Sequence, residues 1–159
     1  DIGKDRFTVD FNHPMAGQAL VLDAEVTARV AAADLDDVVL DWIADPHRCQ
    51  EKAFLEDRPQ VAVLHREGCH WCEKLFSETM TDPRIRRFSD RFVWCSIDTG
   101  DDPDLKSRFR QDGTPNVLLM NPEGKIVTRR DSFVNAADLN RLLRLFLESP
   151  ERFPQAPSP

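Results

Sequence analysis

The stretch Val61–Lys74 constrains the fold more than any other, because its hydrophobic period changes around two cysteines. The apolar, β-branched run Val61–Leu64 is typical of a strand buried on both faces. After Cys72, apolar side chains recur at helical spacing until Asp82-Pro83 stops the run. The sequence therefore predicts that Cys69 and Cys72 lie where a buried strand turns into a helix.

The Cys69-x-x-Cys72 pair is suited to disulfide exchange. The free N–H groups and positive dipole end of the helix stabilise a thiolate at Cys69 more than at Cys72, which is one turn further in. We therefore expect Cys69 to be the nucleophile and Cys72 to resolve the mixed disulfide. A protonated His70 would further favour the thiolate, and Trp71 offers an apolar face beside the sulfur.

Other uses of a Cys-x-x-Cys pair are a structural zinc half-site, a haem attachment and an inert pair. Zinc needs four ligands and usually a second closely spaced pair, whereas Cys49 and Cys95 are isolated in the sequence. Haem attachment needs a His after the second cysteine, where Glu73 stands. We predict no metal and no cofactor, although metal handling by the pair together with His70 stays an alternative.

The composition favours one domain with an appendage: 159 residues, 41% of them hydrophobic, with a net charge of −7. This charge argues against nucleic acid as a partner, and no apolar run approaches the roughly 20 residues that span a bilayer. Four cysteines are too few for a disulfide scaffold. Unpaired Cys49 and Cys95 favour the cytoplasm, but a leader removed before Asp1 would point to a periplasmic or secreted protein, so the compartment stays open.

Residues 6–30 alternate as two strands with a breaker-rich connection. The segment Val9–Leu20, followed by Glu25-Val26, resembles the last strands of FKBP-type peptidyl-prolyl isomerases of the SlyD kind, which carry Val-Asp-x-Asn-His-x-x-Ala-Gly-x-x-Leu. The aromatic proline pocket of that family lies upstream of this segment and is absent, so isomerase activity is not implied. We expect residues 1–33 to be a β-strand remnant or fragment of such a domain.

Periodicity predicts the elements around the cysteine helix. Asp34–Ile43 is expected to form an amphipathic helix, and Pro46–Asp57 a second one with Phe54 and Leu55 pointing inward. Further expectations are a short helix Pro83–Phe88, a strand Phe92–Asp98 with Cys95 in the core, a helix Pro103–Phe109, strands Val117–Met120 and Lys125–Val127, and a final helix Ala136–Glu148 capped by Asn135. Residues 150–159 form a Pro-rich tail expected to be disordered.

The resulting order, βαβ, helix, ββα, places the cysteines at the first βα junction and Thr114-Pro115 before a core strand. Residues of about 42–148 resemble the thioredoxin-like families with a Cys-x-Trp-Cys centre. The motifs are Trp42, Gly68–Cys72, Phe92–Asp98, Gly113–Pro115 and Asn121–Lys125. The resemblance implies an α/β thioredoxin-like fold over 34–149, a central mixed sheet flanked by helices, after an N-terminal two-stranded β appendage.

By the same resemblance, Pro115 is cis and faces the cysteines, and Trp71, Thr114 and Pro115 form a shallow substrate-docking surface. The alternative is a trans proline that simply starts a strand. Thioredoxins also carry a buried carboxylate six residues before the first cysteine, where this chain has Val63. That difference leaves reductase, oxidase and isomerase roles open.

The leading hypothesis is a thiol-disulfide oxidoreductase that acts on protein disulfides through Cys69 and Cys72. Its implied partners are disulfide-containing protein substrates and a redox partner protein, with no nucleic acid or membrane. The alternative from another class is a chaperone-like client-binding module with an incidental redox pair. The direction of exchange, the partners and the oligomeric state stay open.

Overall fold

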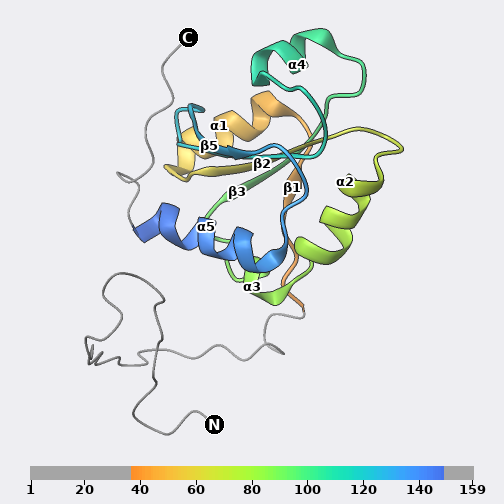
Figure 1. Ribbon diagram of the computed structural model, residues 1–159. Coiled ribbons are helices and arrows are strands. Elements are labelled where there is room, and N and C mark those ends of the chain that lie inside the picture. Colours follow the sequence, from red (N-terminus) through yellow and green to blue (C-terminus); the bar gives the residue numbers. More distant parts are fainter. Residues whose placement is uncertain (1–36, 149–159) are drawn as a thin grey trace, which may run out of the picture. The chain divides into compact units, whose positions relative to one another are not determined.

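The computed structural model describes residues 37–148, shown in colour in Figure 1. The expected two-stranded unit, the FKBP-like segment and the C-terminal tail lie outside the described residues. In chain order the elements are β1 (Trp42–Ile43), α1 (Pro46–Glu56), β2 (Gln60–His65), α2 (His70–Lys74), the π-helical turn η2 (Leu75–Thr79), α3 (Pro83–Arg86), β3 (Val93–Asp98), α4 (Pro103–Phe109), β4 (Asn116–Met120), β5 (Ile126–Arg130) and α5 (Ala136–Glu148).

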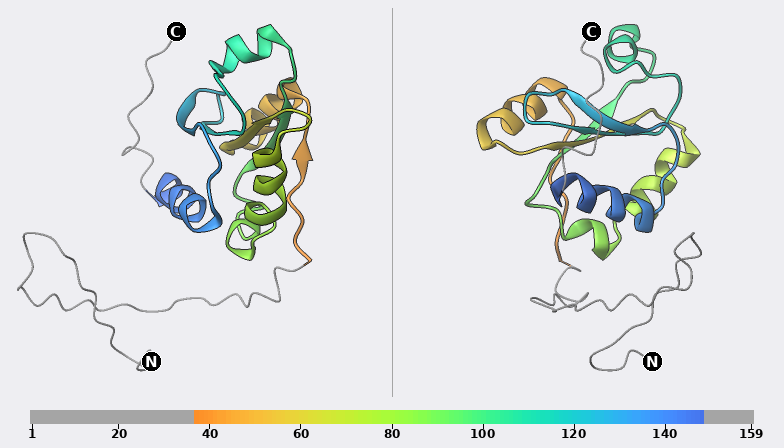
Figure 2. Two further views of the ribbon diagram at one scale, coloured as in Figure 1. Left: turned by 45° about the vertical axis from the view of Figure 1, so that its right-hand side comes forward. Right: turned by 60° about the vertical axis from the view of Figure 1, so that its left-hand side comes forward.

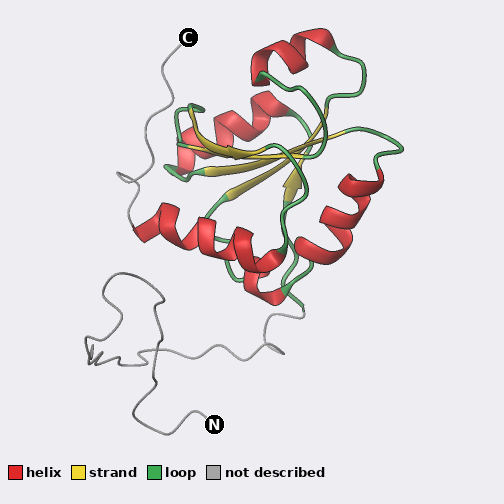
Figure 3. Ribbon diagram, in the orientation of Figure 1, coloured by secondary structure: helices red, strands yellow, loops and turns green. Residues whose placement is uncertain are grey.

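The five strands form one mixed sheet in the order β1-β3-β2-β4-β5. β3 pairs in parallel with both β1 and β2, while β4 runs antiparallel to β2 and to β5. Figure 3 shows these strands in yellow between the red helices. The predicted α/β fold with a central mixed sheet is therefore confirmed.

Alternation along β2 explains why both faces of the sheet are covered. Val61 and Val63 point into a core shared with η2, α3 and α5, whereas Ala62 and Leu64 point into a second core shared with α1 and α4. All four side chains are completely buried. In the right-hand view of Figure 2, α5 and α3 lie below the sheet, and α1 and α4 lie above it.

Three Asp-Pro pairs start helices. The Asp45 carboxylate accepts hydrogen bonds from the backbone N–H groups of His47 and Arg48 at 2.7 and 3.0 Å, and Asp82 and Asp102 cap α3 and α4 in the same way. The proline that follows each cap occupies the first helical turn, where its missing N–H has no cost. The predicted helix starts at Pro46, Pro83 and Pro103 are therefore confirmed.

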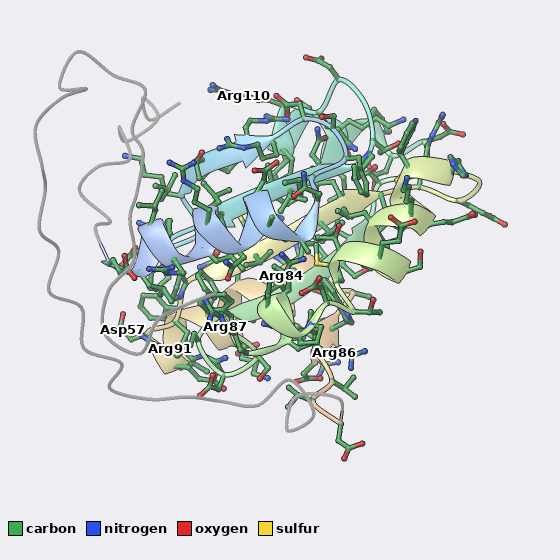
Figure 4. All side chains as sticks on the ribbon, turned by 60° about the horizontal axis from the view of Figure 1, so that its bottom comes forward. Asp57, Arg84, Arg86, Arg87, Arg91 and Arg110 are labelled. Carbon is green, nitrogen blue, oxygen red and sulfur yellow. A yellow bond between two sulfur atoms is a disulfide. The ribbon has the colours of Figure 1, made fainter. Side chains whose placement is uncertain are left out.

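α1 and α4 both end in a left-handed residue. Asp57 and Arg110, labelled in Figure 4, have φ of 49° at these two helix ends. Their N–H groups return to carbonyls of the last helical turn, which satisfies acceptors that a helix end otherwise leaves free. Each helix therefore stops before the loop that leads into the next strand.

The predicted helix Asp34–Ile43 is wrong over its described part, since Trp42 and Ile43 form strand β1. They pair with Trp94 and Cys95 of β3, and the Trp42 ring packs edge-on against Phe76 and Trp94 with centroid distances of 5.3 and 5.7 Å. Pairing and aromatic packing with distant segments override the local helical pattern here.

The predicted inward orientation of Phe54 and Leu55 is also wrong. These side chains are 65% and 75% exposed, whereas Cys49 and Ala53 on the same helix are buried. Cys49 and Ala53 are four residues apart, so they share the face that α1 turns toward the sheet. Their small side chains allow the helix backbone to approach β3 closely.

The final helix is confirmed as α5. Asn135 caps it by accepting a hydrogen bond from the N–H of Asp138 at 2.9 Å, and Leu139 and Leu143 are fully buried against the sheet. None of the helices in residues 37–148 combines the length and apolarity that a bilayer crossing requires.

Candidate active site

Cys69 is the N-cap residue of α2, directly after the loop that follows β2. The backbone N–H of Cys72 donates both to the Cys69 carbonyl at 2.9 Å and to Cys69 Sγ at 3.2 Å, so one N–H of the first turn is shared with the sulfur. The two cysteines form a disulfide with a Cα–Cα distance of 5.2 Å. Cys69 is 8% exposed and Cys72 3%, so the first sulfur is the more accessible one.

Gly68 makes the sharp turn from strand to helix possible. Its φ of +68° lies in the left-handed region, which side chains disfavour. The turn places Cys69 at the end of the sheet where β2 and β3 both finish, because these strands are parallel. Loops that follow both strands therefore surround the cysteine.

Thr114 lies beside the first cysteine although it is 45 residues away in sequence. Its hydroxyl donates to Cys69 Sγ at 3.4 Å, and the Thr114-Pro115 peptide bond is cis. Pro115 is buried, whereas Thr114 remains partly accessible. The structure thus brings together Cys69, Cys72 and Thr114 from two separate segments of the chain.

Thr114 also lines a groove of about 450 Å³. Three loops and one helix line it: Arg66 comes from the loop after β2, Thr99 and Gly100 from the loop after β3, Lys106 from α4, and Gln111 to Thr114 from the loop before β4.

Trp71 lies on the other side of the pair and is 52% exposed. Its ring packs against Phe133 with a centroid distance of 5.7 Å, and Lys74 Nζ lies 5.4 Å and 5.3 Å from the Trp71 and Phe133 ring centroids. The His70 ring contacts Trp71 edge-on at 5.5 Å. The rings of His70, Trp71 and Phe133 therefore form one aromatic cluster, and the Lys74 ammonium lies against two of them.

Phe133 is a site residue that sequence reasoning missed. It lies in the loop between β5 and α5, and the neighbouring Val134 carbonyl accepts a hydrogen bond from Thr79 Oγ1 at 2.8 Å. This bond holds the loop against η2 and therefore holds Phe133 beside Trp71. A single aromatic residue in a polar loop carries no periodicity, so the sequence offered no signal for this contact.

His65 is a half-buried titratable group next to the site. Its Nε2 lies 2.9 Å from Ser96 Oγ, and its ring packs edge-on against Phe76 at 5.4 Å. Phe76 follows Cys72 by four residues, so it extends the helix face that carries Cys72 by one turn. Burial holds the pKa of His65 below its ordinary value, and the charge of Asp98 opposes this only partly.

No carboxylate occupies the sheet position six residues before Cys69. Val63 stands there, fully buried among apolar side chains. Within residues 37–148, no group of three or more His, Cys, Asp or Glu side chains is arranged to hold a metal ion. The chemistry that this arrangement supports directly is that of the two sulfur atoms.

The expectation that Cys49 and Cys95 are unpaired is wrong, because they form a second disulfide with a Cα–Cα distance of 6.1 Å. Cys49 lies on the buried face of α1, and Cys95 lies on β3 beneath it. Free thiols at these two positions therefore no longer support a reducing compartment.

Comparisons with known proteins agree with this geometry. A family model described as a thioredoxin-like domain matches residues 50–147. Among solved structures, a thioredoxin from Thermus thermophilus is 26% identical, with a TM-score of 0.60 over 68% of this chain and 87% of its own. A structure titled DsbH oxidoreductase is 16% identical, with a TM-score of 0.59 over 77% of this chain and 93% of its own.

A third similar structure is the C-terminal domain of DsbD from Neisseria meningitidis in its reduced form, at 20% identity and a TM-score of 0.55 over 62% of this chain and 90% of its own. At these identities, the last two likenesses show the shared fold. A comparison with curated proteins finds no match to this sequence.

Proposed function

The chain belongs to the thioredoxin-like domain family, and we propose that Cys69 and Cys72 are the catalytic pair with which it exchanges disulfides in other proteins. The protein is a thiol-disulfide oxidoreductase, a conclusion that the family and the Cys69–Cys72 disulfide support together. The observation that carries the residue assignment is the position of Cys69 Sγ, at a helix N-cap and within hydrogen-bonding distance of Thr114.

In the reducing direction, the Cys69 thiolate attacks one sulfur of a substrate disulfide. The substrate S–S bond breaks, a mixed disulfide with Cys69 forms, and the departing substrate thiolate takes up a proton. The deprotonated Cys72 then attacks Cys69 Sγ, which releases the second substrate thiol and closes the Cys69–Cys72 disulfide. Two electrons move from the dithiol to the substrate, and the oxidising direction is the same sequence in reverse.

Hydrogen bonding and exposure support these roles for the two cysteines. The N–H of Cys72 stabilises negative charge on Cys69 Sγ, and Cys69 is the more exposed sulfur. Thr114 Oγ1 adds a donor to the same sulfur. Cys72 is nearly inaccessible, as suits a thiol that reacts only with its neighbour.

Trp71 and the Thr114-Pro115 loop are the proposed docking surfaces on the two sides of Cys69. We assign an extended substrate segment to the groove that Thr114 helps to line, and its apolar side chains to the exposed face of Trp71. His70 is a modulating residue that favours the thiolate when it is protonated. The proposed partners are disulfide-containing proteins and a second protein that restores the pair.

Trapping tests the roles of the two cysteines. Cys72→Ser should accumulate a mixed disulfide between Cys69 and a protein substrate such as insulin, whereas Cys69→Ser should accumulate none and should lose turnover. The readout is the mass of the adduct under non-reducing conditions. Equal adduct formation by both variants would contradict the assignment, and equal cellular function of Cys69→Ser would favour the client-binding alternative.

The direction of exchange is decided by the reduction potential of the Cys69–Cys72 pair. Titration in glutathione buffers should give a value near about −270 mV for a reductant, or about −120 to −180 mV for an oxidant or isomerase. The absence of a reversible two-electron couple would refute the oxidoreductase function of the pair.

A further inference from the structure

The disulfide between Cys49 and Cys95 takes no part in the proposed exchange cycle. It joins α1 to β3 within the core that also contains Ala62 and Leu64. The catalytic disulfide lies outside this core, at the end of the sheet where β2 and β3 finish, and the η2 segment that continues its helix packs through Leu75 into the core on the opposite face. The Cα–Cα distance of 6.1 Å lies within the range that disulfides occupy in proteins.

Both sulfur atoms are shielded from exchange partners. Cys49 is 1% exposed and Cys95 is 0% exposed. The cavity beside them, lined by Gln50, Gln60 and Met120 among others, measures about 80 Å³. Because an attacking thiolate has to reach a sulfur directly, a space for only a few water molecules keeps out a protein thiol or glutathione.

The surroundings of Cys95 also suit a thiol. Gln60 is 1% exposed, and its Nε2 donates to Gln50 Oε1 at 3.0 Å and to the Asn121 carbonyl at 3.3 Å. These bonds aim Gln60 Oε1 at Cys95 Sγ, 3.9 Å away. A disulfide sulfur has no hydrogen to share, whereas the S–H group of a Cys95 thiol can donate a hydrogen bond to this oxygen. The site can therefore hold the reduced as well as the oxidised pair.

We propose that Cys49 and Cys95 form a second redox site, which is closed to thiol exchange in the folded domain and whose disulfide holds α1 on the sheet. Its formation needs a disulfide donor, for which oxidised glutathione is sufficient. One cysteine thiolate attacks the S–S bond of oxidised glutathione, which breaks, so that a mixed disulfide forms and one glutathione leaves. The second cysteine then attacks the cysteine sulfur of this mixed disulfide, which closes the Cys49–Cys95 bond and releases the second glutathione. Two protons leave the cysteines, and two electrons pass to the glutathione.

This reaction has to occur while α1 is away from β3, because the folded core admits no donor. The oxidation state of the pair is then fixed when the domain folds, and it does not follow later changes in the redox buffer. The catalytic pair does follow them, because Cys69, though only 8% exposed, lies between the accessible residues Trp71 and Thr114.

Reduction of the full oxidised chain with dithiothreitol tests this separation. Samples taken over time are quenched with acid and alkylated, and the four cysteines are assigned by mass spectrometry of peptides. We expect Cys69 and Cys72 to be labelled about 100-fold faster, or more, than Cys49 and Cys95, because reduction of the buried pair requires the protein to open. In guanidinium this difference should disappear.

Two results would overturn the proposal: labelling of both pairs at the same rate in the folded protein, or labelling of Cys49 and Cys95 without any reductant. Cys69→Ala/Cys72→Ala provides the matched control, since it should show the slow pair alone with an unchanged rate. Substrate turnover is measured separately on wild-type protein, so failure of this inference can be distinguished from failure of the catalytic assignment.

Discussion

Removing the Cys49–Cys95 crosslink should destabilise the domain far more than removing the catalytic one. The perturbation is Cys49→Ala/Cys95→Ala, compared with Cys69→Ala/Cys72→Ala. Alanine is chosen because it leaves no buried hydroxyl without a partner. Each variant removes two sulfur atoms from poorly exposed residues, so the main difference between the variants is the length of the loop that the lost disulfide closed.

The two sequence separations determine the expected magnitudes. The bond between Cys49 and Cys95 closes 46 residues, which reduces the entropy of the unfolded chain by an amount worth about 4 kcal/mol at 25 °C. The bond between Cys69 and Cys72 closes only 3 residues, for which the same relation gives about 1.6 kcal/mol. We therefore expect the free energies of unfolding of the two variants to differ by roughly 2.4 kcal/mol.

Urea unfolding of the oxidised proteins, followed by far-ultraviolet circular dichroism, measures both free energies. Wild-type protein is the common reference, and the slope of each transition reports whether the unfolded states differ in compactness. Equal destabilisation by the two double variants, or a larger effect of the catalytic pair, would refute the loop-length reasoning.

Three further changes test separate features. Gly124→Ala should lower the free energy of unfolding by about 1 to 3 kcal/mol in urea titrations, because φ is +82° there and an added Cβ would overlap the Gln50 amide. Phe133→Ala should raise the KM for a protein disulfide roughly fivefold with little change in kcat, since it removes a ring contact worth about 1 kcal/mol beside Trp71; an unchanged KM would contradict a docking role. Burial lowers the pKa of His65 below 6.5, so the unfolded chain binds this proton more readily and stability should fall as pH drops from 6.5 toward the lower folded pKa. His65→Gln should flatten that part of the stability curve between pH 7.5 and 5.5, and an unchanged slope would show that this histidine is not responsible.

Local sequence patterns were enough to predict the helices and strands whose buried residues recur at regular spacing. The buried run of β2 and the apolar stripe of α5 form as expected, and the Asn121–Gly124 turn closes with a 2.9 Å hydrogen bond between its ends. The same patterns placed the cysteine pair between a strand and a helix. In each case the residues within a few positions of one another determine whether a strand, a helix or a turn forms, so these structures can be predicted from short stretches of sequence.

Long-range pairing was not predictable in the same way. Strand β1 has only two residues, and it is a strand because β3 lies beside it. The Cys49–Cys95 bond joins positions 46 residues apart, and nothing in the spacing identifies them as partners. The direction in which α1 faces was missed because its buried side is made of small residues, while Phe54 and Leu55 remain at the surface.

The two edges of the sheet bear on how this domain avoids aggregation. β1 offers only two residues to an incoming strand, and β5 ends in Arg129 and Arg130. A short edge and a charged edge both discourage another chain from adding a strand to the sheet. Within residues 37–148, neither side of the sheet therefore offers a long uncharged edge on which β-aggregation could begin.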